Sequence, residues 1–179
     1  MIEVEKIKQL DVLFKNRFSH GEWVIDQVEI TPPFVIPKGK FIGLDPGTTN
    51  FGICVLENGK CKTFKVHFKR DKNPVVRMVN TKNLLSYIIN SYEYMNWVCI
   101  EGASYGDIYR QVELAEIRAA CVFWALDRKM EVKISQPSEI RKVVFGNGSI
   151  KGKDIWKDYL SGDAADAVAC AYFASIMKT

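Results

Sequence analysis

Two aspartates, Asp163 and Asp166, stand three residues apart in an otherwise apolar segment, SGDAADAVACAYFASIM, near the end of the sequence. On a helix, residues at this spacing project from one face, so both carboxylates would point the same way. The alanines around them keep such a helix thin, and the larger apolar residues favour packing against a core. The segment Ser161 to Met177 is therefore predicted to be a helix that holds two carboxylates at the edge of a core.

Two more carboxylates stand at the ends of apolar runs: Asp45 ends FIGLD and Glu101 ends WVCIE. If these runs are neighbouring strands, both acids meet Asp163 and Asp166 at one end of a sheet. Unit charges ~4 Å apart repel by about 4 kcal/mol at an effective dielectric near 20, so such a cluster needs protons or bound cations. Mg²⁺ prefers oxygen ligands, and a pair of these ions can clamp a phosphodiester. The four carboxylates are thus predicted to be catalytic metal ligands.

A structural alternative remains open for the two helical aspartates. Ser161 would cap the helix, and negative charge near its N-terminus would complement the helix dipole. Zinc chemistry is disfavoured, because the chain has two histidines, His20 and His67, and five cysteines without the close spacing of a zinc site. Any metal would then be held by oxygen.

Composition limits the class of protein. With 179 residues, 47% of them hydrophobic, the chain suits one domain with a sizeable core. A formal net charge of +4 permits binding to nucleic acid without requiring it. The N-terminal segment MIEVEKIKQL is charged, and no run approaches the ~20 apolar residues of a membrane span. A cytoplasmic location with no membrane partner is expected.

The order of predicted elements indicates a fold. FIGLD predicts a strand, and FGICVLENGKCKTFKVHF predicts a hairpin that turns at Asn58-Gly59 and has a wet, basic face in its second arm. Apolar residues three and four apart predict helices over about 75–92 and 111–128, while NWVCIE and EVKIS predict strands. This order is typical of the α/β ribonuclease H-like fold, a five-stranded mixed sheet with three antiparallel strands followed by parallel strands, flanked by helices.

The first 39 residues differ in character from this domain, which is assigned to 40–179. They are predicted to be an N-terminal arm with a short helix around Val4 to Phe14. The arm would add packing to the fold, or its basic residues, including Lys15 and Arg17, would contact DNA or a second subunit.

Four stretches, GLDPGTTNFG, IEG, GNGS and DAADAVACAYFA, resemble RuvC-type Holliday junction resolvases over about residues 41–179. The resemblance implies a homodimeric, magnesium-dependent endodeoxyribonuclease that nicks two strands of like polarity at a four-way DNA junction. Two Mg²⁺ per active site are implied, with Mn²⁺ able to substitute. The acidic residues of the family match Asp45, Glu101, Asp163 and Asp166. The apolar stripe on helix 111–128, with Phe123, is the expected dimer interface.

The same resemblance implies DNA-binding residues. Tyr105, with Tyr109 in reserve, matches an aromatic wedge, Arg141 stands where a phosphate-contacting lysine is usual, and Lys151 or Lys153 replaces a lysine expected at Gly152. The connection before Asp163 is shorter than usual in the family, which predicts a truncated helix beside the site. This shortening and the extra arm are compatible with a bacteriophage member, located in the host cytoplasm.

Three alternatives remain at this stage. The enzyme could cut a broader range of branched DNA, such as forks, flaps and three-way junctions. GLDPGTTN is also similar to the phosphate loop of actin-like and heat-shock ATPases, which would make the chain a nucleotide-binding protein. The third alternative is a noncatalytic DNA-binding module.

Overall fold

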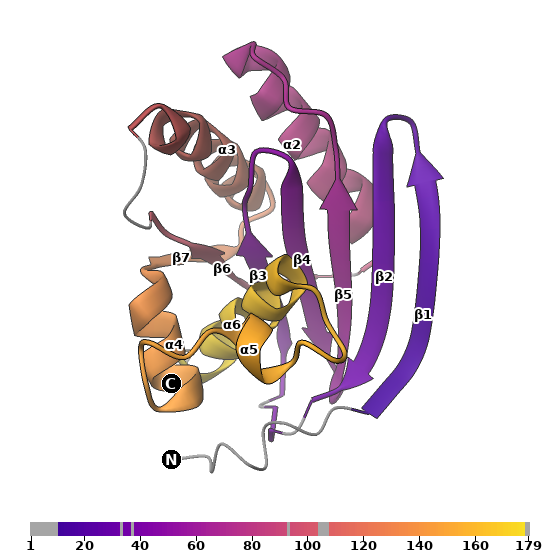
Figure 1. Cartoon of the computed structure of the whole chain (residues 1–179), viewed down its shortest axis with the longest axis vertical. Coiled ribbons are helices and arrows are strands. Elements are labelled where there is room, and N and C mark those ends of the chain that lie inside the picture. The colour runs from indigo at the N-terminus through magenta and orange to yellow at the C-terminus, as the bar shows by residue number, and fades with distance from the viewer. Residues whose placement is uncertain (1–10, 33, 37, 93, 104–107, 178–179) are drawn as a thin grey trace.

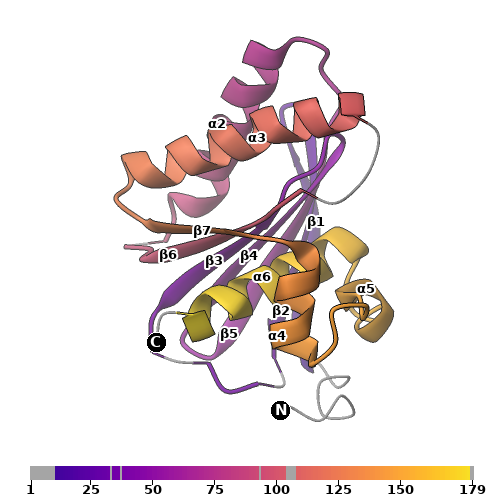
Figure 2. The ribbon, with the colours of Figure 1, turned by 90° about the vertical axis from the view of Figure 1, so that its left-hand side faces the viewer.

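A seven-stranded mixed sheet separates two layers of helices in the computed structural model (Figures 1 and 2). The structure describes residues 11–32, 34–36, 38–92, 94–103 and 108–177. The strands are β1 (Asp11–His20), β2 (Trp23–Thr31), β3 (Lys40–Asp45), β4 (Asn50–Glu57), β5 (Lys60–His67), β6 (Trp97–Glu101) and β7 (Glu131–Ser135). Their order across the sheet is β1-β2-β5-β4-β3-β6-β7. β3, β6 and β7 run parallel to one another, and the remaining pairs are antiparallel.

Helices cover both faces of this sheet (Figure 2). α2 (Pro74–Ile89) and α3 (Ile108–Asp127) lie on one face. α4 (Pro137–Phe145), the four-residue α5 (Gly152–Ile155) and α6 (Gly162–Met177) lie on the other. From β3 onward the predicted strands and helices occur in the predicted order, with α4 and α5 added between β7 and α6. The short α5 agrees with the truncation expected before Asp163. The prediction of a ribonuclease H-like α/β fold is confirmed.

The strand count differs from the prediction because the first part of the chain is itself β-structure. β1 and β2 form a hairpin that pairs with β5 and extends the sheet from five strands to seven. The helix expected around Val4 to Phe14 is wrong for residues 11–14, which begin β1, and residues 4–10 lie outside the described residues. Aromatic and β-branched residues in β1 and β2 favour this pairing. The boundary between an arm and a domain at residue 39 stays a prediction.

The hairpin between β4 and β5 turns where the sequence predicted it. Asn58 and Gly59 have φ angles of 52° and 78°, the left-handed values that a two-residue turn with the twist of the strands requires. This turn lies at the opposite end of the sheet from the end of β3. The predicted wet, basic face of β5 is only partly correct, because Cys61 and Thr63 are buried on the same face as Lys65 and His67.

Each face of the sheet has its own core. The face toward α2 and α3 buries large side chains such as Trp124, Phe51 and Leu85. The face toward α6 is lined by the alanines of that helix together with Phe41, Phe173 and other residues. Among the described helices, none is both long and apolar enough to cross a bilayer.

Candidate active site

Three acidic side chains meet where β3 and β6 end beside α6. Asp45 and Glu101 are the last residues of β3 and β6, two neighbouring parallel strands, so both carboxylates reach the same edge of the sheet. Asp166 lies on the second turn of α6. The carboxylates of Asp45, Glu101 and Asp166 each offer an oxygen within 4.8 Å of the others, and all three side chains are partly exposed. The predicted convergence of these residues is therefore present in the structure.

The close approach of α6 to the sheet depends on residues without side chains. A Cβ at Gly43 of β3 would collide with the backbone of Ala167 and Ala171, and one at Gly52 of β4 would collide with the backbone of Asp163. The helix in turn presents alanines to the strands. Because the backbone of α6 lies this close to the strands, the side chain of Asp166 lies beside that of Asp45.

Asp163 occupies a different position from Asp166. It lies outside the set of three close carboxylates, and one of its oxygens is 3.4 Å from Nζ of Lys65 on β5. Its charge nevertheless acts on Asp45, whose pKa it raises. Asp163 thus borders the cluster on the side of β4 and β5.

Burial and mutual repulsion favour protonated acids in this cluster. Burial raises the pKa of Asp45 well above its usual range, and the charges of Glu101 and Asp166 raise it further. Burial, with the charge of Asp166, raises the pKa of Glu101 to about 7. The two acids also interact through their side chains, which raises the pKa of Asp45 and lowers that of Glu101. Burial also raises the pKa of Asp166. Without a cation, burial and mutual repulsion therefore disfavour the charged form of all three acids.

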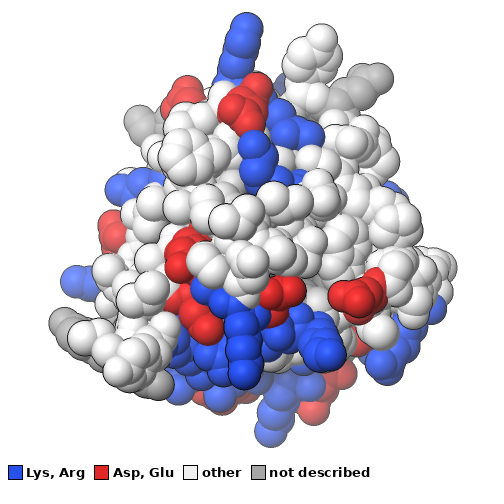
Figure 3. Space-filling view, turned by 90° about the horizontal axis from the view of Figure 1, so that it is seen from above, with Lys and Arg blue, Asp and Glu red and all other residues white. Residues whose placement is uncertain are grey.

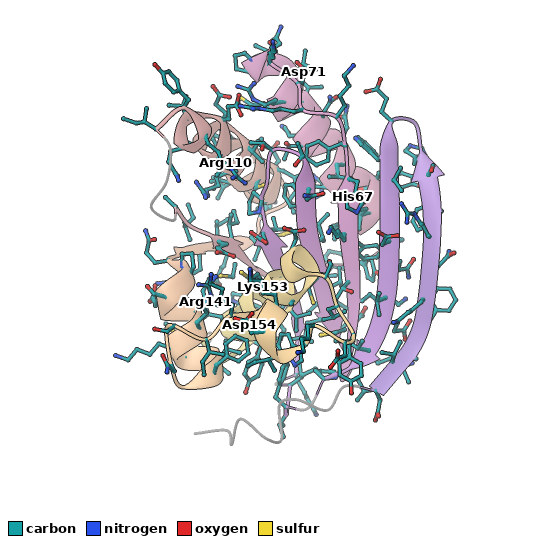
Figure 4. The ribbon with its side chains drawn as sticks, viewed as in Figure 1. His67, Asp71, Arg110, Arg141, Lys153 and Asp154 are labelled. Carbon is teal, nitrogen blue, oxygen red and sulfur yellow. The ribbon has the colours of Figure 1, made fainter. Side chains whose placement is uncertain are left out.

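Basic residues surround the acidic cluster on the side of α4 and α5. Nη2 of Arg141, on α4, is 4.0 Å from Glu101 and 3.9 Å from Asp166. Lys153, on α5, lowers the pKa of Asp166 by its charge. Figure 4 shows Arg141 on α4 and Lys153 on α5, the two short helices that pack beside α6. Seen from above, acidic side chains lie next to a dense group of basic ones (Figure 3).

The structure also explains why glycine stands where the resemblance expected a lysine. The backbone of Gly152 packs on Ala165, where an added Cβ would lie 3.1 Å from the backbone, and its backbone hydrogen bond lowers the pKa of Asp166. Lys151 and Lys153, on either side of Gly152, are both exposed. Of the two, Lys153 is the one whose charge lowers the pKa of Asp166.

Of the two candidate wedge residues, Tyr109 belongs to the part of the chain that the structure describes. Tyr105 lies outside the described residues. Tyr109 is 79% exposed in the first turn of α3, at the end of the segment that follows Glu101.

The capping hydrogen bond expected from Ser161 is wrong: its Oγ is buried and has no hydrogen-bond partner among the described residues.

Sequence reasoning missed Arg118. From α3, on the opposite face of the sheet, Nε and Nη2 of this side chain donate hydrogen bonds of 2.9 Å to the carbonyl oxygens of Glu101 and Gly102. It therefore fixes the backbone at the point where β6 delivers its carboxylate. An arginine within an amphipathic helix gives no signal in the sequence that it points back to a strand end.

Comparison with known proteins agrees with this geometry. The family model of crossover junction endodeoxyribonuclease RuvC matches residues 41–172. No curated protein sequence matches the chain. The structure is similar to that of Thermus thermophilus RuvC in complex with Holliday junction substrate, with a TM-score of 0.60 and 15% identity over 75% of this chain and 91% of that one. A second Thermus thermophilus RuvC structure gives a TM-score of 0.56 and 17% identity over 74% and 90% of the two chains. The chain therefore belongs to the RuvC family of crossover junction endodeoxyribonucleases, the family that its motifs indicated.

Proposed function

We propose that this Holliday junction resolvase hydrolyses DNA with Mg²⁺ held by Asp45, Glu101 and Asp166, and that Asp163 completes a second metal position next to Asp45. The observation that carries the proposal is the set of three carboxylate oxygens within 4.8 Å of one another. The pKa values of all three acids are raised, because burial and mutual repulsion disfavour their charged forms when no cation is bound. Oxygen donors at this spacing fit magnesium, and Mn²⁺ should substitute for it.

Bound divalent ions would lower the pKa of the attacking water and neutralise charge on the leaving oxygen. The protein's own residues prepare the site for this chemistry. The backbone around Glu101 is fixed by Arg118, and Asp166 is fixed by a thin helix packed on glycines. Arg141 and Lys153 lie where they can bind phosphate oxygens beside the acids. Tyr105 and Tyr109 remain the proposed residues for stacking on junction bases.

Resolution by paired nicks needs two active sites at a fixed separation, and we propose a homodimer formed through α3. The apolar stripe predicted as the interface faces the sheet, where Ile117 and Trp124 are buried, so of the predicted residues only Phe123 is available. The outer side of the helix exposes Val112, Phe123 and Leu126, which are 57%, 56% and 54% exposed. Large apolar side chains aligned on one helix favour a self-complementary interface. Light scattering should show a dimer for the wild type and a monomer for Phe123→Glu. A wild-type monomer that still makes paired nicks would contradict the proposed interface.

The test of the function compares matched four-way, three-way and linear DNA in Mg²⁺, with the product ends mapped. Symmetrical nicks in the four-way junction and slow cutting of the other substrates are expected. Equal cutting of all branched forms would favour the broader structure-selective endonuclease, and no cutting in either Mg²⁺ or Mn²⁺ would reject the assignment.

A further inference from the structure

A straight row of residues runs across the sheet from the acidic cluster to its outer edge. The strand register places five residues next to one another on consecutive strands, all on the α6 face: Asp45, Gly52, Lys65, Asp26 and Arg17. Neighbouring strands lie about 4.8 Å apart, so Arg17 lies roughly 19 Å from Asp45 along this row. The last two residues belong to the β1–β2 hairpin, which precedes the part of the chain that matches the family.

The row becomes more open with distance from the acids. The start of α6 lies directly over Gly52, where an added Cβ would collide with Asp163. Beyond it the side chains of Lys65, Asp26 and Arg17 are 21%, 34% and 70% exposed. No described helix lies over the hairpin on this face in Figure 1. An accessible polar surface therefore leads from the active site to the edge of the sheet.

The basic side chains near the outer edge of this surface make weak, exchangeable contacts. Nε of Arg17 is 3.4 Å from Asp26, and Nε2 of His67 is 3.4 Å from the other oxygen of the same carboxylate. Lys15, which is also exposed, stands two residues from Arg17 on the same side of β1. Ion pairs as exposed as that of Arg17 contribute little to stability, so a phosphate can take the place of the carboxylate. Arginine suits this exchange because its planar fork binds phosphate oxygens in pairs.

The opposite face of the hairpin is anchored to the body of the protein. The His20 ring stacks on Tyr87 of α2 with centroids 3.8 Å apart, and Phe18 and Trp23 pack against the core on that side. The hairpin is therefore a fixed extension of the sheet, and its position relative to the acids is set by packing.

We propose that Lys65 and Arg17 bind the phosphate backbone of one DNA strand that leads away from the scissile phosphate, with the hairpin acting as an additional DNA-binding surface. This rests on the proposed nuclease function. At 3.4 Å of helix axis per nucleotide, a separation of roughly 19 Å limits the phosphate at Arg17 to within about six nucleotides of the cleavage point.

The test measures junction binding in Ca²⁺ for the wild type, Arg17→Ala and Lys133→Ala. Lys133 is the matched control, because it is an exposed lysine on β7, the edge strand at the far side of the sheet. Arg17→Ala should weaken binding about threefold to tenfold and lower the slope of log affinity against log salt by about 0.9, the loss of one phosphate contact. Lys133→Ala should leave both unchanged. Equal melting temperatures would show that all three proteins are folded.

Substrates with single neutral methylphosphonates then locate the contact. One substitution, within about six nucleotides of the cleavage point, should weaken binding of the wild type and have no further effect on Arg17→Ala. If no position depends on Arg17 in a wild type that binds and cuts junctions, the hairpin surface is rejected and the nuclease function stands. If the wild type fails to bind junctions, the proposed function and this extension of it are both overturned.

Discussion

On one face of the sheet a single helix, α6, contacts the strands through glycines and alanines, whereas on the other face α2 and α3 pack through side chains as large as Trp124. The first arrangement brings backbone against backbone and leaves little freedom for adjustment. The second packs large side chains against one another and can relax around a change. The acids lie on the first face, which indicates that the close packing of α6 serves to position carboxylates.

The largest expected effect on junction cleavage follows from adding one methyl group to the face of the sheet that α6 covers. Gly43→Ala would place a Cβ against the backbone of Ala167 and Ala171, so α6 must move away from β3. Overpacking costs about 1–3 kcal/mol, occasionally more, and here the moving helix also carries Asp166. Both the melting temperature and junction cleavage should fall steeply.

Leu85→Ala is the matched change on the other face. It removes a fully buried side chain from α2 and should cost about 2–5 kcal/mol of stability while the folded fraction still cleaves at the normal rate. If Gly43→Ala retained cleavage and Leu85→Ala lost it in folded protein, the division of roles between the two faces would be wrong.

An intermediate effect is expected for Arg118, which connects the two faces. Arg118→Met keeps much of the side-chain length but removes both hydrogen bonds to the carbonyls of Glu101 and Gly102. Hydrogen bonds from a charged group contribute about 1.5–3 kcal/mol, so a comparable loss of unfolding free energy is expected, together with weaker metal affinity. Calorimetry with Mn²⁺ and denaturant unfolding would measure the two quantities. Unchanged metal affinity would limit Arg118 to a structural role.

A smaller effect concerns pH and stability in metal-free buffer. The pKa of Glu101 is raised from 4.5 to about 7, so the folded state holds a proton that the unfolded state releases in this range. The contribution of Glu101 to the free energy of unfolding is therefore fully present below pH ~4.5 and is lost as the pH rises toward ~7. Glu101→Gln, which cannot ionise, should remove this part of the slope and melt higher than wild type at pH 8. The same melting curve for both proteins at pH 5 and pH 8 would contradict the account of the cluster.

Much of the domain could be predicted because its signals are local. The pair Asn58-Gly59 predicts a turn. The spacing of apolar residues, alternating or three and four apart, predicts the strands and helices. The acids at the ends of two strands predict one edge of the sheet as the site. The motifs around Asp45 and Asp166 then indicated the family. Convergence of Asp45, Glu101 and Asp166 followed from the topology alone.

The rest depends on contacts between distant segments. The predicted helix overlaps the start of β1 because the charged residues there hide the alternation of apolar and polar side chains. This segment becomes a strand by pairing with β2. The effect of Lys153 on the pKa of Asp166 depends on the packing of α5 against α6. The separation of Asp163 from the close cluster depends on Lys65, a residue almost one hundred positions earlier, and no spacing rule could reveal it.

The central claim is that the carboxylates on α6 hold metal for DNA cleavage and do not merely stabilise a helix end. Its most direct test is nicking of a four-way junction in Mg²⁺ by the wild type, Asp166→Asn and Asp163→Asn, with junction affinity measured in parallel in Ca²⁺. Asparagine keeps the size and removes the charge. The account predicts that both variants lose cleavage, bind junctions at least as tightly as the wild type because repulsion of phosphate is relieved, and keep their fold. Near-normal nicking by both variants would contradict it, because asparagine can serve a helix N-terminus but cannot replace a carboxylate that binds magnesium.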